Sequence, residues 1–373
     1  MAATCRRWRA VALLTPALWT DVSYTISKRA AFPQNRWASC FETHVERSRA
    51  LLLDVDIHWR ATRGLVPDLH MAVLALTRRA RTFSFKTHAN MGPYEFFGAA
   101  PHLLDCTITH AVEDVGSLPW RLFLQAPRLT SFAFRGYRLD WAGNQPTFPH
   151  IRRLALDEYA FAANDFSFTL ERLVPHVQEL SLIVRGVCAS SLSVRAPHLR
   201  TLRLSMPSGT LGFIPACDFP ALRTVSISLV EYSSEANITA LMHSCLGTVD
   251  ALSLSLGQNL LSTSVLDGLT VCGNVKSLNL VMGSYPDDRI PIIEGLRLPA
   301  LCPRLETLTL IFRGSSAGLF SLVWQPFARA VDALAEARRP VLKSVELFDP
   351  DDELVPGALQ ALQQRLNTTL GSA

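Results

Sequence analysis

The sequence predicts an α/β fold: a solenoid in which a curved parallel β-sheet carries helices and irregular segments on its convex side, preceded by a short N-terminal helix. Two observations predict this class. One apolar phrase recurs along most of the 373 residues, and the segments between its copies are long enough to hold helices. Hydrophobic residues make up 49% of the chain and charged residues 18%, so the composition allows an extended buried core.

The recurring phrase has the form P-x-L-x-x-L-x-L, and APHLRTLRLSM (196–206) is its clearest copy. With the proline numbered zero, apolar residues fall at +2, +5 and +7. Positions +5 and +7 alternate with polar residues, which predicts a strand with one buried face, and position +2 is expected to close the same core. Most copies follow one another after 22 to 27 residues, within the interval of a leucine-rich repeat. Copies start at 78, 101, 127, 149, 175, 197, 220, 247, 273, 303 and 340.

The segments between the strands hold the expected helices. Helical or irregular structure is expected over 67–80, 233–246 and 262–273, and a better helix over 325–339. The solenoid is therefore placed at 67–350, and residues 351–373 are expected to hold a capping helix, over 356–366, and a tail. The Asn or Cys of the usual repeat is replaced after the last leucine, so irregular loops are expected there, at Tyr137, Tyr159, Arg185 and Pro207.

The first 22 residues contain a motif of a different kind, CRRWRAVALLTPALW (5–19). It resembles the last helix of an F-box, as found in fungal F-box proteins that continue into divergent leucine-rich repeats. Residues 23–66 are then a connecting segment and a first strand, with 41–59 similar to the helix and strand that follow in such proteins. The matching residues are Cys5, Arg6, Arg7, Trp8, Arg9, Pro16, Leu18 and Trp19.

The resemblance implies a non-enzymatic substrate receptor of an SCF-type ubiquitin ligase, located in the cytoplasm or nucleus and bound to a protein target. A whole F-box would begin well upstream of Cys5, so the Skp-family adaptor is expected to bind only if the motif is completed there. The chain is then a fragment, a product of a misplaced gene start, or a protein that has lost the adaptor. Two alternatives remain: a free-standing repeat scaffold, and a helix whose Trp8, Val11 and Leu14 merely pack on the first repeat. The arginines near the start also fit a mitochondrial presequence, which is less favoured.

Catalytic and metal-binding motifs are not found in the sequence, so no enzyme, cofactor or metal is expected. Asp54 and Asp56 form a D-x-D, but the apolar residues around them favour an exposed strand edge. The eight cysteines contain no C-x-x-C, which argues against a zinc site. Four histidines, each inside a copy of the repeat, are interpreted as turn residues: His102, His150, His176 and His198.

Nucleic acid and membrane are unlikely partners on charge and hydropathy. Residues 1–100 hold fourteen Lys or Arg and seven Asp or Glu, a net +7, but the arginines are scattered and form no stripe that could follow a phosphate backbone. No run reaches the ~20 apolar residues that span a bilayer.

The expected site of function is the concave face of the sheet, which carries the side chains at +4, +6 and +8. Most of these are small or hydroxylated, and the charged ones gather on neighbouring strands. They are candidate contacts for a protein target or, equally, an inter-strand salt-bridge set that neutralises itself. A second, apolar patch is expected from Ile183, Val281, Ile311 and Phe348. The charged candidates are Arg135, Arg153, Asp157, Glu179 and Arg203.

Overall fold

The structure is a computed structural model. It describes residues 6–26, 34–60, 67–87, 95–110, 120–136, 139–140, 149–158, 174–184, 195–206, 218–229, 239, 242–243, 246–256, 262–282, 290–312, 317–349 and 356–371. The tyrosines and the other residues named for the turns after the strands lie outside these ranges.

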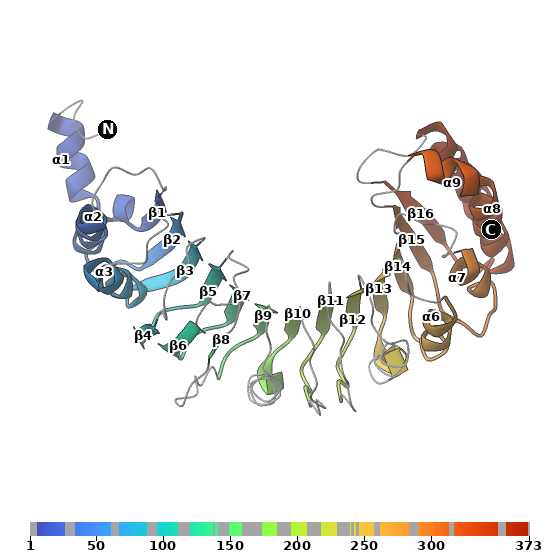
Figure 1. The fold of residues 1–373 in the computed structure, drawn as a ribbon, viewed down its shortest axis with the longest axis horizontal. Helices are drawn as coiled ribbons and strands as arrows, with labels where there is room; N and C mark the ends of the chain where they lie inside the picture. The colour runs from blue at the N-terminus through green and yellow to red at the C-terminus, as the bar shows by residue number, and fades with distance from the viewer. Residues whose placement is uncertain are drawn as a thin grey trace. The chain divides into compact units, whose positions relative to one another are not determined.

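The main sheet confirms the predicted α/β solenoid. Its thirteen strands follow one another in the order of the sequence, and each pair whose register is described runs parallel (Figure 1). The strands are β1 (Asp21–Ile26), β2 (Leu53–Trp59), β3 (Ala80–Thr87), β5 (Asp105–His110), β7 (Ser131–Gly136), β9 (Arg153–Glu158), β10 (Glu179–Val184), β11 (Thr201–Met206), β12 (Thr224–Leu229), β13 (Ala251–Leu256), β14 (Ser277–Met282), β15 (Thr307–Phe312) and β16 (Ser344–Phe348).

The buried positions are those the repeat predicts. In the clearest copy, Leu199, Leu202 and Leu204 at +2, +5 and +7 are 0%, 2% and 8% exposed. The same three positions are buried in each of the other copies except the last, where Leu347 at +7 is only partly buried. Each strand therefore buries one face only, and the side chains at +4, +6 and +8 lie on the opposite face, called here the open face.

Each repeat closes its own turn and is joined to the next by one carbonyl. The Leu199 N–H donates to the Ala196 carbonyl at 3.2 Å, so the turn before the strand is hydrogen-bonded. The carbonyl at +3, called here the strand-entry carbonyl, accepts two N–H groups of the following repeat: that of Arg200 accepts from Arg223 and Thr224, both at 2.9 Å. The pattern recurs along the sheet, so the backbone itself satisfies the polar groups where each strand begins.

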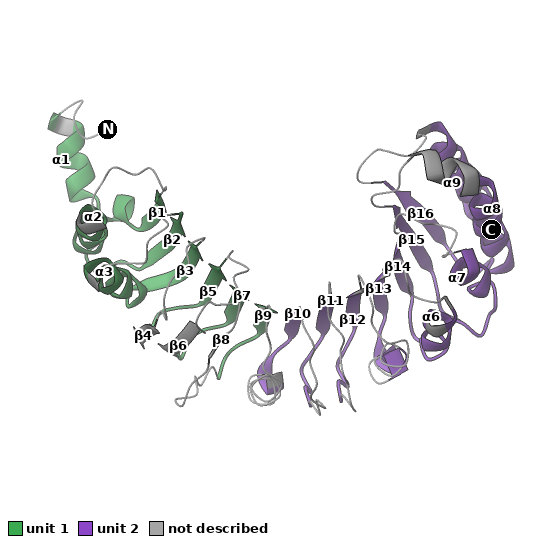
Figure 2. Cartoon of the chain, in the orientation of Figure 1, with its two compact units in different colours: residues 1–160 green, residues 161–373 purple. Residues whose placement is uncertain are grey.

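Residues 1–160 form one compact unit, unit 1 (Figure 2). Its helical segments are α1 (Arg6–Leu14), η1 (Pro16–Trp19), α2 (Gln34–Arg47) and α3 (Pro67–Thr77). The chain after β3, β5 and β7 forms no helix in the described residues but a second parallel sheet, which the sequence did not suggest, of β4 (Glu95–Ala99), β6 (Trp120–Gln125) and β8 (Leu139–Asp140).

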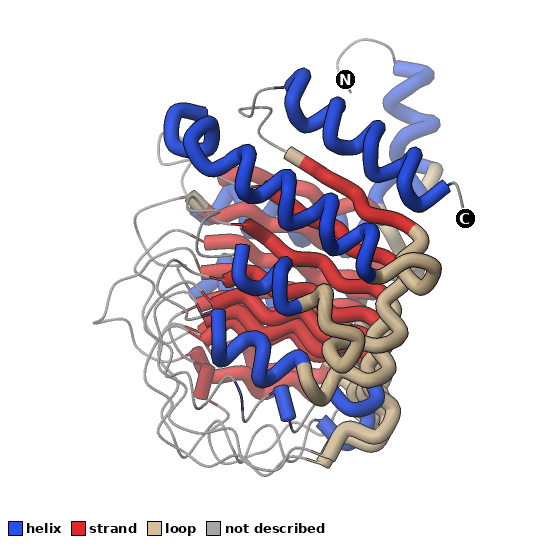
Figure 3. Tube along the Cα trace, turned by 90° about the vertical axis from the view of Figure 1, so that its right-hand side faces the viewer, coloured by secondary structure: helices blue, strands red, loops and turns tan. Residues whose placement is uncertain are grey.

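Residues 161–373 form unit 2. Figure 3 shows its longer helices lying across one face of the last strands of the sheet. Phe327 of α8 meets Phe312 of β15 edge-on, with 5.6 Å between ring centroids, and both are fully buried. The helical segments are η2 (Val174–His176), η3 (Leu246–Thr248), α6 (Ser262–Leu269), α7 (Ile290–Gly295), α8 (Ala317–Ala337) and α9 (Pro356–Gly371).

The helix boundaries differ from those expected in four segments, one of which, expected over 262–273, is helical only as far as Leu269. The helix expected over 67–80 ends at Thr77, because Ala80 already belongs to β3. The helix expected to begin at 325 begins at Ala317 and runs through Pro326, where proline removes one N–H bond without ending the helix. The last helix continues beyond 366 to Gly371. Most of the segment 233–246 lies outside the described residues.

Candidate functional site

The F-box-like motif forms α1 and η1, and most of its described side chains point into solvent. Trp8 is 71% exposed, Leu14 71% and Leu18 61%. The side chains of Trp8, Val11 and Leu14 therefore do not pack on the first repeat, and that alternative for the N-terminal helix is wrong. Cys5 and the side chain of Arg7 lie outside the described residues, while Arg6 and Arg9 are exposed.

Trp19 is the residue of the motif that attaches it to the repeats. Its indole N–H donates to the Ala12 carbonyl at 2.7 Å, which fixes the angle between α1 and η1, the segment that begins at Pro16. The ring packs edge-on against His44 of α2, and the Arg47 guanidinium lies 4.4 Å from its centroid. The motif thus divides into one tryptophan that packs and one, Trp8, that is exposed.

An aromatic cluster continues this attachment into β1. The Tyr24 hydroxyl lies 2.9 Å from Nε2 of His44, whose other ring nitrogen lies 3.2 Å from the Trp19 carbonyl. Trp37 and Phe41 of α2 meet the Tyr24 ring edge-on. Burial raises the pKa of Tyr24, and Cys40 nearby adds to the rise. β1 pairs with β2 and so belongs to the sheet. The sheet thus begins one strand earlier than the strand expected within 41–59 from the F-box resemblance.

The charged candidates in unit 1 pair within the unit. Arg135 of β7 and Asp157 of β9 are register neighbours at +8, and Nε of Arg135 lies 3.1 Å from the carboxylate. Arg153 reaches past the intervening Ser131 to Asp105 of β5, with 3.4 Å between the charged atoms. These three candidates are therefore engaged in ion pairs on the open face of their own unit.

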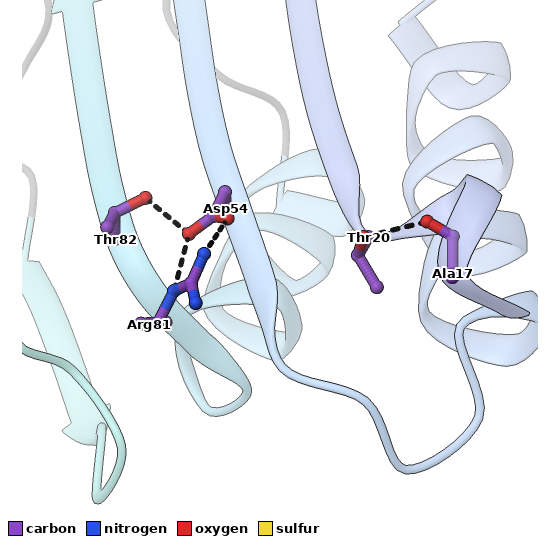
Figure 4. Close-up of polar contacts among 5 residues, drawn as sticks. All are labelled: Ala17, Thr20, Asp54, Arg81 and Thr82. Carbon is purple, nitrogen blue, oxygen red and sulfur yellow. Dashed lines mark hydrogen bonds and ion pairs between the residues drawn. The ribbon is translucent and has the colours of Figure 1, made fainter.

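Asp54, the first acid of the D-x-D, is paired in the same way near the start of the sheet. Figure 4 shows Asp54 of β2 held by Arg81 and Thr82, which both belong to β3. The Arg81 guanidinium donates two hydrogen bonds to the carboxylate, at 3.1 and 2.5 Å, and the Thr82 hydroxyl donates a third at 2.9 Å. The hydrogen bond with Arg81 lowers the pKa of Asp54, although partial burial opposes the change. Asp54 is thus paired with side chains of β3, while Asp56 is exposed.

The charged candidates in unit 2 differ from those in unit 1 because no ion pair is seen for them among the described residues. Glu179 of β10 and Arg203 of β11 are both exposed, and within the described part of the chain neither makes an ion pair. Their neighbours on the open face are small or hydroxylated, since Arg203 lies between Ser181 and Ser226 in the register of the three strands. Two charged side chains without an ion-pair partner among the described residues therefore lie on a surface of small polar side chains.

The apolar candidates of unit 2 form a row. Register pairs Val281 of β14 with Ile311 of β15, and Ile311 with Phe348 of β16. Val281 and Ile311 are partly exposed and Phe348 is 55% exposed. Ile183 occupies the same position in β10, but three serines separate it from these residues along the register. The apolar row therefore consists of Val281, Ile311 and Phe348, at about the strand spacing of 4.8 Å.

Within the part of the chain that the structure describes, metal-binding side chains do not gather at these surfaces. The four histidines of the repeat are exposed, three of them in turns and His176 at the end of η2. Among the described residues no three His, Cys, Asp or Glu side chains come together as a metal site. Cys272 and Cys302 do meet, with the Arg338 guanidinium bound to the Cys302 carbonyl. The hydrogen bond between the thiols raises the pKa of Cys272 and lowers that of Cys302, but both are fully buried.

Sequence reasoning missed Asp105 as the partner of Arg153, and it missed Arg81 and Thr82 as the partners of Asp54. The pairing of Arg135 with Asp157 could have been predicted from the sequence, because both occupy +8 in successive repeats and must therefore be neighbours. The reach of Arg153 across a whole strand depends on side-chain length and leaves no periodic signal.

Comparison with known proteins finds no family model that matches the chain, and no curated protein that matches it. In the described residues, no helix is both long and apolar enough to cross a membrane.

Proposed function

We propose that the chain is a non-enzymatic protein-recognition module, a substrate receptor resembling those of SCF-type ubiquitin ligases. The observation that carries the proposal is the exposure of Trp8, Leu14 and Leu18 on a segment that Trp19 fastens to the repeats. Large apolar side chains exposed together are typical of a surface that another protein covers. In this proposal the Skp-family adaptor provides that cover, inside the cell, in cytoplasm or nucleus, with the fungal F-box proteins as the related class.

The target side of the module is assigned to the open face of unit 2. Arg203 and Glu179 are exposed there without ion pairs among the described residues, so a partner can satisfy them without first breaking an existing pair. The apolar row adds contact area of the kind that forms the centre of an interface. The ion-paired residues of unit 1 fit a structural role better, because a partner would have to replace Asp157 at Arg135.

The test is capture of a purified Skp-family adaptor by this chain, beside a version extended into the reading frame that precedes it. We expect capture by the extended form, and Trp8→Ala should weaken it by about tenfold or more, as for an aromatic anchor of an interface. Met71→Ala is the matched control, since Met71 is a large apolar side chain of the same unit, 59% exposed on α3. If the extended form is not captured, the ligase connection is wrong.

The alternative is a free-standing repeat scaffold, and the packing of Trp19 favours it. A motif whose second tryptophan binds Ala12, His44 and Arg47 can serve as the N-terminal cap of the sheet with no adaptor. The two functions differ in the behaviour of Trp8. In a scaffold, Trp8→Ala leaves both stability and partner binding unchanged, whereas Trp19→Ala loosens α1 and η1 and lowers stability.

A further inference from the structure

The last strand of the sheet does not end in an open backbone edge, because one side chain of α9 occupies it. The Leu347 N–H donates to Oε1 of Gln363 at 2.9 Å, and Nε2 of Gln363 donates to the Val345 carbonyl at 2.7 Å. The same Nε2 also donates to Oδ1 of Asn367 at 3.0 Å, which holds the amide in place. A single side-chain amide therefore both donates to and accepts from β16.

These two bonds are those that another strand would make. The Ser344 N–H of β16 donates to the strand-entry carbonyl of Glu306, so the backbone groups of residue 344 face β15. Backbone groups alternate along a strand, so those of Val345 and Leu347 face away from β15. In a parallel ladder, one residue of an added strand would donate its N–H to the Val345 carbonyl and accept from the Leu347 N–H. Gln363 stands where that residue would lie, opposite Glu346.

The first strand, β1, has an outer edge whose backbone groups could make the two bonds that Gln363 makes to β16. The Thr20 and Ile26 carbonyls accept from Asp54 and Arg60, so even-numbered backbone groups face β2 and those of Ser23 and Thr25 face outward. β1 stands first in the strand order, and no strand of the described chain pairs with its outer side. Unpaired edges of this kind are the usual starting points of strand addition.

We propose that the outer edge of β16 is a strand-addition site that Gln363 keeps closed, and that its occupant when open is β1 of a second copy of this chain. With Ser23 in the place of the Gln363 amide, opposite Glu346, Val22 falls beside Val345 and Tyr24 beside Leu347. This register keeps the buried Val22 and Val345 on one face and the exposed Ser23 and Glu346 on the other. The contact joins two different edges, so it is heterologous and adds copies head to tail.

The packing of α9 against the rest of unit 2 explains why the site stays closed. Leu362 and Leu366 are fully buried, and Arg365 pairs with Asp332 of α8 at 2.9 Å. The amide is therefore presented by a helix that lies beside β16, so β1 can be added only if losing the two bonds lets α9 move off this edge.

The experiment compares the molar mass in solution of the whole chain and its Gln363→Leu variant over a range of concentrations. Leucine keeps the packing volume but removes both bonds to β16, so the mass is expected to rise with concentration to about twofold or more, while the unchanged chain stays monomeric. Gln364→Leu is the control, because Gln364 lies on the same helix and is exposed. Gln363→Asn, whose amide is one methylene short, serves as a second variant if leucine impairs folding.

The occupant is tested by adding Ser23→Pro to Gln363→Leu. Proline removes the outward N–H of β1 and leaves its bonds to β2 intact, so the double variant should return to the monomeric mass. A heavier double variant would show that β1 is not the occupant. A monomeric Gln363→Leu with faster amide exchange at Leu347 would overturn the proposal, since Gln363 would then be only a structural tie. Neither readout involves adaptor or target, so the result is independent of the proposed function.

Discussion

The open faces of the two units are built from the same positions of the same repeat but use charge in opposite ways. In unit 1, Arg135 and Arg153 have carboxylate partners within the unit, whereas in unit 2 Glu179 and Arg203 have none among the described residues. The difference shows that a repeat determines where a side chain points but not whether it is already satisfied. Partner binding is therefore expected where the repeat leaves charges unsatisfied.

The largest expected effect is a loss of stability when a ring on the buried side of the sheet is removed. Phe134→Ala in unit 1 and Phe312→Ala in unit 2 remove fully buried rings and should each lower the free energy of unfolding by about 3–5 kcal/mol. Denaturant unfolding gives the size, and amide exchange shows whether each loss stays within its unit. Phe348→Ala, on the open face of unit 2, should change stability by less than about 0.5 kcal/mol. A large cost at Phe348 would mean that the apolar row is structural.

The next largest effect is the stability cost of adding a methyl group at one glycine in each unit. A Cβ on Gly136 of β7 would lie 2.8 Å from Cζ of the buried Phe134, so Gly136→Ala should cost about 1–3 kcal/mol. Gly247 of unit 2 has nothing within 4 Å of the same position, and Gly247→Ala should be neutral or slightly stabilising. Thermal unfolding of the two variants side by side measures the contrast, and equal losses would contradict it.

A smaller effect tests the charges themselves. Arg135→Ala leaves Asp157, whose side chain is 11% exposed, without its guanidinium partner and should cost about 1–2 kcal/mol. Arg203→Ala removes a charge that makes no ion pair in the described residues, so its cost should stay below about 0.5 kcal/mol. Urea unfolding at neutral pH distinguishes them. If Arg203→Ala is the costlier change, the charges of unit 2 are structural and the target surface is misplaced.

The smallest effect is a dependence on pH. The pKa of Asp54 is lowered by Arg81, so the folded state binds a proton there less readily than the unfolded chain does. The stabilisation is therefore complete above the unfolded pKa, near 4, and is lost as the pH falls through the folded value. Asp54→Asn should flatten the fall in urea midpoint below about pH 4, by a small amount because the pair is solvent-screened. An unchanged acid profile would mean that other carboxylates dominate.

The sequence was sufficient for the parts of the molecule that depend on burial. Alternation at +5 and +7 placed the strands, and the single buried face placed Arg203 and Phe348 on the other one. The second sheet was not predicted, because its short strands follow no shared spacing in the three repeats. The start of α8 was missed for a related reason: Pro326 is a good first residue of a helix, and only packing shows that the helix begins earlier.

The strand-entry carbonyl also bears on how such a chain can change in length. The carbonyls of Arg223, Asp250 and Lys276 each receive the same pair of N–H groups from the repeat that follows. A duplication or loss of one whole repeat in the gene would therefore bring together a carbonyl and two donors that already suit one another. The connections between successive repeats are therefore interchangeable, so selection could lengthen or shorten the sheet by one strand at a time.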